Sequence, residues 1–123
     1  MILVFGGAYQ GKLDYARENF DIKKVCDCKG GKTPEFDGDA VYGTEDFVLE
    51  CASAGMEATD FFRENKELWQ DKVIIITDVS QGIVPIDKKM RAFREMNGRL
   101  MLYLAGEADE VHRVFCGLGK RVK

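Results

Sequence analysis

The sequence is poor in the features that mark several large classes of protein. It holds two prolines and one histidine among its 123 residues, and it has no low-complexity tract and no internal repeat. A disordered linker, a collagen-like chain and a solenoid are therefore excluded. No apolar run approaches the roughly 18 residues that a membrane span needs, and the first residues lack the charged flank of a signal peptide. We therefore expect a cytosolic protein without a membrane span.

Basic charge is also scarce. The formal net charge is -3, which gives no field for holding a nucleic-acid backbone, so nucleic acid is not an expected partner. Residues 33–62 contain no Lys or Arg, but eight acids: Glu35, Asp37, Asp39, Glu45, Asp46, Glu50, Glu57 and Asp60. This segment is typical of a solvated acidic face, and the alternative is a role in repelling or orienting an anionic ligand.

The four cysteines do not form a recognisable framework. Cys26 and Cys28 form a single Cys-x-Cys pair with no second pair to complete a zinc site, and Cys51 and Cys116 are scattered. We expect reduced thiols, with a metal or redox role as the minor alternative.

What the sequence does contain is an alternation of strands and helices. Hydrophobic residues make up 46% of the chain, enough for one domain over residues 1–123. Residues 2–5 form an unbroken β-favouring run, and residues 12–20 carry apolar side chains at helical spacing. Residues 73–77 predict a central strand, because consecutive β-branched aliphatic residues require burial on both faces.

The remaining elements are shorter or less regular. We expect strands at residues 22–28, 39–42 and 111–116, the last followed by a turn and a short tail. Thr44 is expected to cap a helix that Gly55 ends, and a second helix at residues 56–68 is expected to direct Phe61, Phe62 and Trp69 to the core. A helix at residues 86–105 carries an apolar stripe of Met90, Phe93, Leu100 and Leu104. This order predicts an α/β layered domain with a mainly parallel sheet, which places ligands at the carboxyl ends of its strands.

A glycine-rich motif joins the first strand to the first helix. It reads Gly6-Gly7-Ala8-Tyr9-Gln10-Gly11-Lys12, which matches the phosphate-binding pattern G-x-x-x-x-G-K in the strand-to-helix context that gives the pattern meaning. The loop amides and the helix start favour an anion, and Lys12 can reach the terminal phosphates. The alternative is a glycine-rich turn with a solvated lysine.

One position departs from this pattern. The residue after the lysine ordinarily gives a hydroxyl oxygen to magnesium, whereas here Leu13 has no oxygen. Either other ligands and waters hold the magnesium, or the loop binds phosphate without efficient transfer.

Asp78 is the second candidate site residue. It closes the apolar strand at residues 73–77, where nucleotide enzymes place a carboxylate that contacts the metal or orients the attacking group. The alternative is an aspartate that starts a turn by accepting local backbone amides. Glu45, Asp46 and Glu50 are lesser candidates.

Three parts of the chain carry a resemblance to a known family. The first is residues 2–12, which contain Gly6, Gly7, Ala8, Tyr9, Gln10, Gly11 and Lys12. The second is Thr77-Asp78 followed by Gln81, Gly82, Ile83, Val84 and Pro85. The third is made of Phe93-Arg94, Gly98-Arg99, residues 108–111 and residues 116–119. In these segments the chain resembles the adenosylcobinamide kinase/adenosylcobinamide-phosphate guanylyltransferase family. The resemblance covers the first dozen residues and nearly all of residues 73–123.

The resemblance implies a P-loop NTPase-like three-layer domain that binds ATP or GTP with Mg2+. It implies that residues 6–13 bind the nucleotide, that Lys12 and Asp78 act in catalysis with Asp78 also on the metal, and that residues 81–85 shape the acceptor side. Arg94 and Arg99 would help to neutralise phosphate, although an arginine on a charged helix is by default solvated. The reaction would be phosphorylation of the aminopropanol hydroxyl of a corrinoid in cobalamin assembly or salvage, by a homo-oligomer that is commonly a trimer.

The chain departs from that family at two further points. Members with guanylyltransferase activity carry a histidine between the two motifs, whereas the only histidine here is His112 in the last expected strand. Relatives also carry an acid pair where this chain has Thr77-Asp78. Guanylyl transfer through a histidine is therefore not expected, and two hypotheses stay open: a kinase of this type, or a catalytically degenerate protein that binds nucleotide or corrinoid as a sensor or assembly partner.

Overall fold

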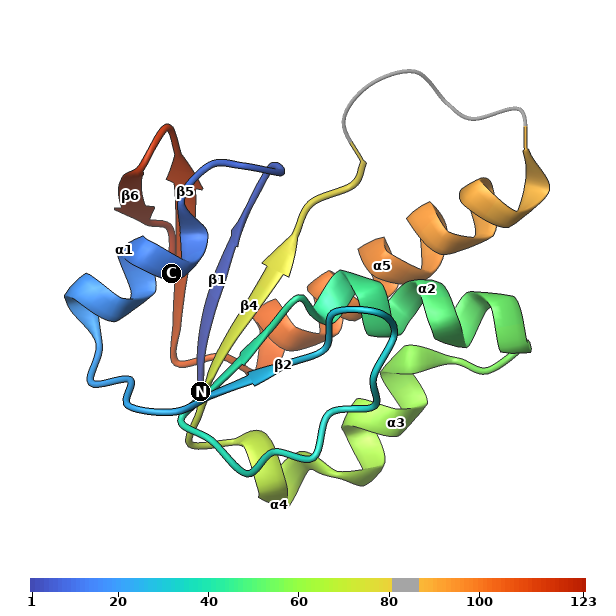
Figure 1. Ribbon diagram of the computed structural model, residues 1–123, viewed down its shortest axis with the longest axis horizontal. Coiled ribbons are helices and arrows are strands. Elements are labelled where there is room, and N and C mark those ends of the chain that lie inside the picture. The colour runs from blue at the N-terminus through green and yellow to red at the C-terminus, as the bar shows by residue number, and fades with distance from the viewer. Residues whose placement is uncertain (81–86) are drawn as a thin grey trace.

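The protein is built on one six-stranded sheet, seen in Figure 1. The computed structural model describes residues 1–80 and 87–123. In these residues the strand order is β2-β3-β4-β1-β5-β6, and every neighbouring pair is parallel except β5 and β6, which are antiparallel. The strands are β1 (Ile2–Gly6), β2 (Val25–Asp27), β3 (Ala40–Tyr42), β4 (Val73–Thr77), β5 (Glu110–Phe115) and β6 (Leu118–Arg121).

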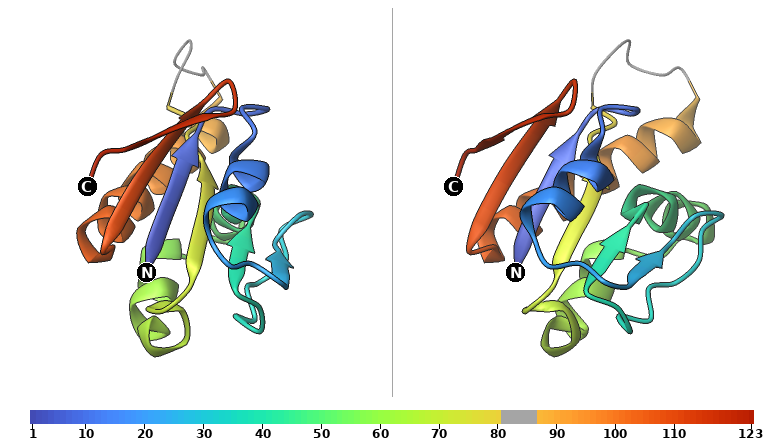
Figure 2. Two further views of the ribbon diagram at one scale, coloured as in Figure 1. Left: turned by 90° about the vertical axis from the view of Figure 1, so that its left-hand side faces the viewer. Right: turned by 60° about the vertical axis from the view of Figure 1, so that its left-hand side comes forward.

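Helices cover both faces of this sheet and give the three-layer α/β arrangement expected from the sequence. Figure 2 shows the first helix on one face and the last, longest helix on the other. The helices are α1 (Lys12–Asn19), α2 (Thr44–Ala54), α3 (Ala58–Glu64), α4 (Lys66–Trp69) and α5 (Lys88–Glu107). The fold is that of a P-loop NTPase-like domain, with β1 in the interior of the sheet between β4 and β5.

Two apolar clusters hold the layers together. The larger lies between the sheet and helices α2, α3 and α5, and its fully buried members include Phe62, Trp69 and Leu100. The smaller lies under α1 and contains Val4, Ala16, Ile75 and Val114. β4 contributes to both clusters, because successive side chains of a strand point to opposite faces of the sheet. Its first four residues are all buried, which confirms the prediction of a central strand.

Several element boundaries differ from the sequence prediction. β2 has three residues where seven were expected, since the backbone amides of Lys23 and Lys24 donate to the Asp39 carboxylate instead of pairing along a strand. The helix expected at residues 56–68 is two helices that meet at Asn65, whose side chain donates to the Phe61 carbonyl. The prediction for Phe62 and Trp69 is confirmed, and Phe61 is half-buried against the same cluster.

The predicted cap at Thr44 was wrong. Thr44 is the first residue of α2, and its buried hydroxyl donates to the Ile75 carbonyl at 3.0 Å, so that it ties α2 to β4. Gly43 precedes the helix and Gly55 ends it, both in the left-handed region with φ of 68° and 71°. The prediction for Gly55 is therefore confirmed.

The last two elements also extend beyond the prediction. α5 runs to Glu107, and the Asp87 side chain caps its start by accepting from the Lys89 amide. Met90 was expected on the apolar stripe of this helix, but it is 41% exposed. The expected tail is the strand β6, which pairs with β5 through a turn at Cys116 and Gly117 with φ of 51° and 75°. Positive φ at two consecutive turn residues is typical of a tight β-hairpin. The sequence did not indicate this hairpin, because Cys116-Gly117 is not one of the usual turn pairs Asn-Gly or Asp-Gly.

Candidate nucleotide site

The glycine loop, residues 6–12, lies at the carboxyl end of β1 and leads into α1 (Figure 1). Gly11 precedes the helix in the left-handed region with φ 81°, and Tyr9 has φ 58° with its side chain fully exposed. Only glycine adopts this region without strain, so Gly11 is required for the chain to turn from the loop into the helix. The motif therefore joins a strand to a helix, as the sequence predicted, with Gly11 at the turn between them.

The hairpin of β5 and β6 holds the loop from one side. The Gln10 side-chain oxygen accepts from the Cys116 amide at 2.6 Å, and the Gln10 carbonyl accepts from the Gly117 amide at 2.8 Å. A Cβ atom on Gly11 would come within 3.3 Å of the Gly117 Cα atom. The loop is thus fixed to a segment more than a hundred residues away in the chain.

Lys12 is folded into the loop. Its side chain is 7% exposed, and its ammonium group donates to the Gly7 carbonyl at 2.7 Å. Burial holds the pKa of Lys12 below its ordinary value, and the nearby negative charge of Glu45 opposes this shift. Within the described residues, the ammonium group is therefore held inside the loop by one backbone acceptor.

A large hollow opens beside the loop and α1. Its volume is about 760 Å³, within the range of small-molecule sites. The residues that line it come from the loop, α1, the ends of β2, β3 and β4, and the starts of α2 and α5: Ala8, Tyr9, Gln10, Gly11, Lys12, Leu13, Asp14, Asp27, Lys29, Tyr42, Gly43, Glu45, Asp46, Leu49, Thr77, Val79 and Phe93. Most of the loop residues predicted to bind nucleotide thus face one space at the carboxyl ends of the strands.

Glu45 is the acid that this hollow places near Lys12. One of its carboxylate oxygens accepts from the Thr77 amide at 2.9 Å, so α2 is joined to the end of β4. Its position on the first turn of a helix after a short strand made it only a lesser candidate in the sequence. Leu13 lines the same hollow and offers no oxygen.

Asp78 lies directly beyond β4, next to the start of the loop. Its amide donates to the Gly6 carbonyl at 2.8 Å. One carboxylate oxygen accepts from both the amide and the hydroxyl of Ser80, at 2.9 and 2.6 Å. The turn-forming role that was the alternative interpretation is therefore present. Asp78 also lines a small hollow of about 50 Å³ together with Gly6, Gly7 and Gln10.

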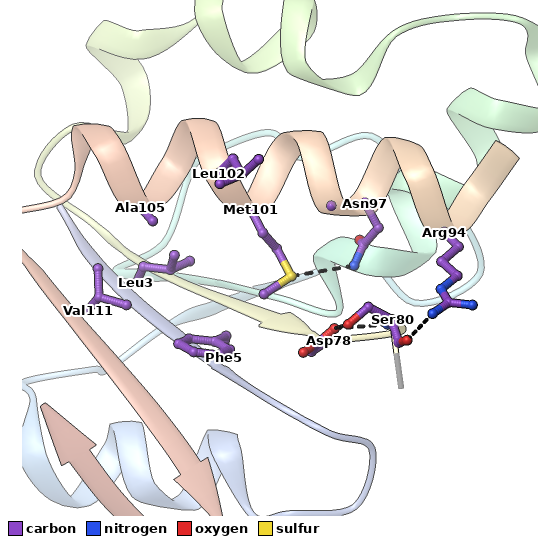
Figure 3. Close-up of a pocket in the computed structure, with 11 residues that line it drawn as sticks. Leu3, Phe5, Asp78, Ser80, Arg94, Asn97, Met101, Leu102, Ala105 and Val111 are labelled. Carbon is purple, nitrogen blue, oxygen red and sulfur yellow. Dashed lines mark hydrogen bonds between the residues drawn. The ribbon is translucent and has the colours of Figure 1, made fainter. Parts of the chain in front are cut away.

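A further cavity, also lined by Asp78, lies between α5 and strands β1 and β5 (Figure 3). Its volume is about 390 Å³. Most of its wall is apolar, whereas Asp78, Ser80, Arg94 and Asn97 gather at one end. A guanidinium nitrogen of Arg94 donates to the Ser80 carbonyl. No pattern in the sequence indicated Asn97, because a single amide on an amphipathic helix is indistinguishable from a surface residue.

The other predicted site residues lie apart from this arrangement. Arg99 pairs at 2.9 Å with Glu57, the residue before α3, and residues 81–85 lie outside the described part of the chain. His112 is 8% exposed; its Nδ1 lies 2.8 Å from the Tyr15 hydroxyl and its Nε2 lies 3.1 Å from the Glu110 carboxylate. Both ring nitrogens of the histidine are thus engaged on the α1 side of β5.

Thiol chemistry is not favoured at the buried cysteines. All four cysteines are free, and burial raises the pKa of Cys28 to about 12 and that of Cys51 to about 11.

Within residues 1–80 and 87–123, no group of three His, Cys, Asp or Glu side chains is arranged to hold a metal ion. No helix in those residues is long and apolar enough to cross a membrane.

Comparison with known proteins identifies a family and two relatives of this chain. The family model described as cobinamide kinase / cobinamide phosphate guanyltransferase matches residues 43–122. The bifunctional adenosylcobalamin biosynthesis protein CobU of Salmonella typhimurium is 43% identical over 53 residues, and that of Escherichia coli strain K12 is 42% identical over 53 residues. Each alignment covers 42% of this chain and 29% of the relative's length.

The matched range includes β3, β4, Asp78, α5 and the β5–β6 hairpin, but it begins after the glycine loop. The loop motif and the family match are therefore independent observations, and the fold brings them together through Gln10, Cys116 and Gly117. The chain belongs to the cobinamide kinase / cobinamide phosphate guanyltransferase family.

Proposed function

We propose that this chain binds ATP or GTP through residues 6–13 and transfers the γ-phosphate to the hydroxyl of a corrinoid. The observation that carries the proposal is the glycine loop itself: a left-handed turn at Gly11, Lys12 folded inside it, and a hollow of about 760 Å³ beside it at the carboxyl ends of the strands. This is the place where a parallel sheet binds phosphate groups.

On phosphate binding, the ammonium group of Lys12 would exchange its backbone acceptor for a phosphate oxygen. Lys12 now donates to the Gly7 carbonyl, and a bound phosphate would offer it charged oxygens instead. A hydrogen bond between two charged groups is stronger than one to a neutral carbonyl, so the exchange favours the bound state. Its low exposure places this cation where water competes least.

Magnesium fits the residues present with fewer protein ligands than usual. Leu13 gives no oxygen, but Glu45 accepts from the amide of the last residue of β4 and Asp78 follows that residue in the chain. Each carboxylate has one oxygen without a hydrogen bond within the described residues. Because Mg2+ prefers oxygen ligands and retains several waters, one or two carboxylates and the phosphates suffice to hold it. When bound, the ion would neutralise charge on the transferred phosphate.

Guanylyl transfer is not part of the proposal. A histidine nucleophile needs a free ring nitrogen facing the nucleotide, whereas both nitrogens of His112 contact Tyr15 and Glu110, and His112 does not line the hollow.

The proposal also includes association of this chain into a homo-oligomer, as the resemblance to the family implies. Arg94 is retained as a residue near the acceptor, since it lies at the polar end of the cavity beside Asp78.

A second candidate function is nucleotide binding without transfer, as a sensor or assembly partner. Two observations favour it: Leu13 stands at the metal-binding position, and Ser80 already occupies one oxygen of Asp78. The experiment that separates the two functions measures triphosphate binding with and without magnesium, followed by transfer of labelled γ-phosphate from ATP and from GTP to cobinamide. Magnesium-dependent binding with transfer supports the kinase; binding that ignores magnesium, without transfer, supports the sensor.

A further inference from the structure

We propose that Arg113 of β5 binds the phosphate chain of the nucleotide, as a second cation in addition to Lys12. This inference rests on the proposed binding of nucleotide by residues 6–13. It adds a contact from a strand that the phosphate motif does not include, near the other end of the chain. The ligand class is a nucleoside triphosphate, and the contact is a guanidinium group on phosphate oxygens.

The first argument is the position of Arg113 at the start of the glycine loop. In the parallel pair of β1 and β5 it is the register partner of Phe5, and the next residue, Val114, is the partner of Gly6. A Cβ atom on Gly6 would overlap the Val114 carbonyl, so the loop begins in close contact with the backbone of β5. The sheet therefore fixes the backbone of Arg113 next to the loop.

The second argument is the small hollow that Arg113 lines. Gly6, Gly7, Gln10 and Asp78 are also part of its wall, whereas Lys12 is not. Its volume of about 50 Å³ is far below the range of sites for whole small molecules, so it suits one small group of a larger ligand. A guanidinium there would reach a phosphate held by the loop from a space that the lysine does not occupy.

The third argument is the set of hydrogen-bond donors at this hollow. The side-chain oxygen of Gln10 accepts from the Cys116 amide, and the nitrogen of the same side chain lies 4.0 Å from the position of a Cβ atom on Gly7. Within the described residues, neither this nitrogen nor the guanidinium of Arg113 has an acceptor. A phosphate would offer both donors charged oxygens, which the planar fork of an arginine matches in geometry.

The fourth argument is the balance of charge at the loop. The carboxylate of Asp78 lines the same hollow, and it would repel a phosphate unless a cation lies nearby. No ion pair joins Arg113 and Asp78, both of which are described residues, so the guanidinium is available to a phosphate. Lys12 supplies one positive charge against the several negative charges of a triphosphate, and Leu13 offers no oxygen to a metal ion. Arg113 supplies a second positive charge.

The fifth argument is that the charge of Arg113 does not stabilise the fold. Its register partner in the antiparallel pair of β5 and β6 is Lys120, and like charges directly opposite each other in a sheet are destabilising. Arg121, the other arginine of the hairpin, pairs with Glu110 at 3.6 Å, whereas Arg113 has no acidic partner among the described residues. Ligand binding therefore accounts for this cation better than packing does.

The test compares Arg113→Gln with Arg91→Gln. Arg91 is the matched control, because it is also an exposed arginine without an ion pair among the described residues, and it lines neither hollow at the loop nor the α5 cavity. Arg113→Lys keeps the charge but loses the planar fork. Thermal unfolding checks that each variant is folded, and Arg113→Gln should unfold at or above the temperature of the parent, since a like-charge pair is removed. Calorimetric titration with magnesium present measures binding of nonhydrolysable ATP and GTP analogues and of adenosine and guanosine.

We expect Arg113→Gln to bind the triphosphate about tenfold more weakly than the parent, which is the effect of losing one hydrogen bond between charged groups. Arg91→Gln would match the parent, Arg113→Lys would lie between the two, and nucleoside binding would be the same in all four proteins. Unchanged triphosphate affinity in Arg113→Gln would overturn the inference. So would an equal loss in Arg91→Gln, which would indicate attraction by overall charge, or an equal loss for the nucleosides. Failure of the parent itself to bind triphosphate would instead remove the proposed function.

Discussion

At the scale of the residue, Lys12 is the position on which the proposed phosphate site depends most. The motif places a lysine after the last glycine of the loop, and the structure shows why its position matters: the ammonium group is buried and satisfied by one backbone carbonyl. Such a cation is available to an anion at a small cost, since a single hydrogen bond has to be exchanged. The prediction for this residue could be made from spacing alone, because the motif is local.

Replacing Lys12 tests this directly. We expect Lys12→Met to weaken binding of a nonhydrolysable triphosphate by about 10- to 100-fold, the range expected for loss of a hydrogen bond between charged groups, while adenosine or guanosine binding stays within about twofold of the parent. Lys23→Met is the matched control, since Lys23 is exposed and outside the loop. Calorimetric titration measures all three proteins. Equal losses for triphosphate and nucleoside would take Lys12 out of the phosphate site.

The same residue predicts a pH dependence. Burial lowers the pKa of Lys12, so the ammonium form is lost at a lower pH than for an ordinary lysine. Because the phosphate needs the charged form, triphosphate affinity should fall as the pH rises through this lowered pKa, and it should stay unchanged below it. Lys12→Met should lack this alkaline loss. A parent protein whose affinity has the same pH profile as Lys12→Met would contradict the assignment.

At the scale of the element, an ion pair that the sequence did not indicate joins α5 to Glu57, the residue before α3. Arg99 pairs with Glu57 at 2.9 Å, and its hydrogen bond is the main reason that the pKa of the Glu57 carboxyl is lowered. The sequence offered Arg99 as a substrate-binding residue because it follows a glycine in the family's pattern. Its partner lies 42 positions away in the chain, and a contact of that separation is not visible in spacing.

This ion pair makes a prediction about stability. Glu57→Gln should lower the free energy of unfolding at neutral pH by a few tenths to about 1 kcal/mol, since both side chains are partly exposed. The carboxylate has a lowered pKa in the folded state, so its contribution is present above the ordinary carboxyl pKa and is lost as the pH falls through the lowered value. Urea unfolding of parent and variant should therefore converge in acid. A difference that persists at low pH would show that the variant acts through packing instead.

The contact between α1 and β6 makes a second prediction at this scale. Gly119 in β6 lies against the ring of Tyr15, and a Cβ atom there would overlap the ring. We expect Gly119→Ala to destabilise the protein by about 1 to 3 kcal/mol through overpacking, whereas Gly98→Ala, with nothing near its Cβ, should stabilise it by about 0.5 to 1 kcal/mol. Denaturant unfolding measures both variants. A neutral Gly119→Ala would mean that the β5–β6 hairpin is not packed on α1.

Elements were predictable where their signals were local. Strand β4 follows from consecutive buried β-branched residues, and Gly55 marks the end of α2. β6 was missed because all four of its residues are exposed and its pairing with β5 depends on left-handed backbone at Cys116, which a cysteine rarely adopts. Thr44 was misassigned because its hydroxyl finds a partner on β4, and no local pattern encodes that contact.

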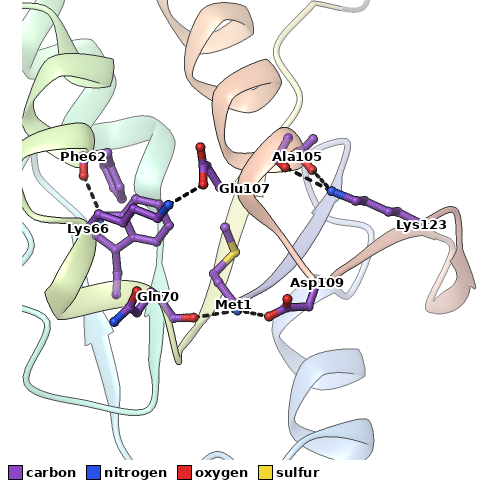
Figure 4. Close-up of polar contacts among 10 residues, drawn as sticks. Met1, Phe62, Lys66, Gln70, Ala105, Glu107, Asp109 and Lys123 are labelled. Atoms are coloured by element: carbon purple, nitrogen blue, oxygen red, sulfur yellow. Dashed lines mark hydrogen bonds and ion pairs between the residues drawn. The ribbon is translucent and has the colours of Figure 1, made fainter.

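At the scale of the whole molecule, the candidate site lies at one end of the sheet and a group of polar anchoring contacts lies at the other. The loop, Asp78 and both hollows lie at the carboxyl ends of the parallel strands. At the opposite end, polar contacts tie the sheet to its helices (Figure 4): the Met1 amine contacts Asp109 and the Gln70 carbonyl, each at 2.7 Å, and Lys66 pairs with Glu107 at 2.6 Å. The fold class was predictable because the alternation of strands and helices determines it, and the same alternation places the candidate site at the carboxyl ends of the strands. The α5 cavity was not, since its wall combines residues from three elements.

The central claim is that residues 6–13 bind a triphosphate. The most direct measurement is a titration of the isotope-labelled protein with nonhydrolysable ATP and GTP analogues, with and without magnesium, followed through its backbone amide NMR signals. We predict saturable shifts concentrated at the amides of Gly7 to Leu13 and at Cys116 and Gly117, which Gln10 couples to the loop. If neither analogue binds, or if saturating shifts leave the loop amides unmoved, the account is contradicted.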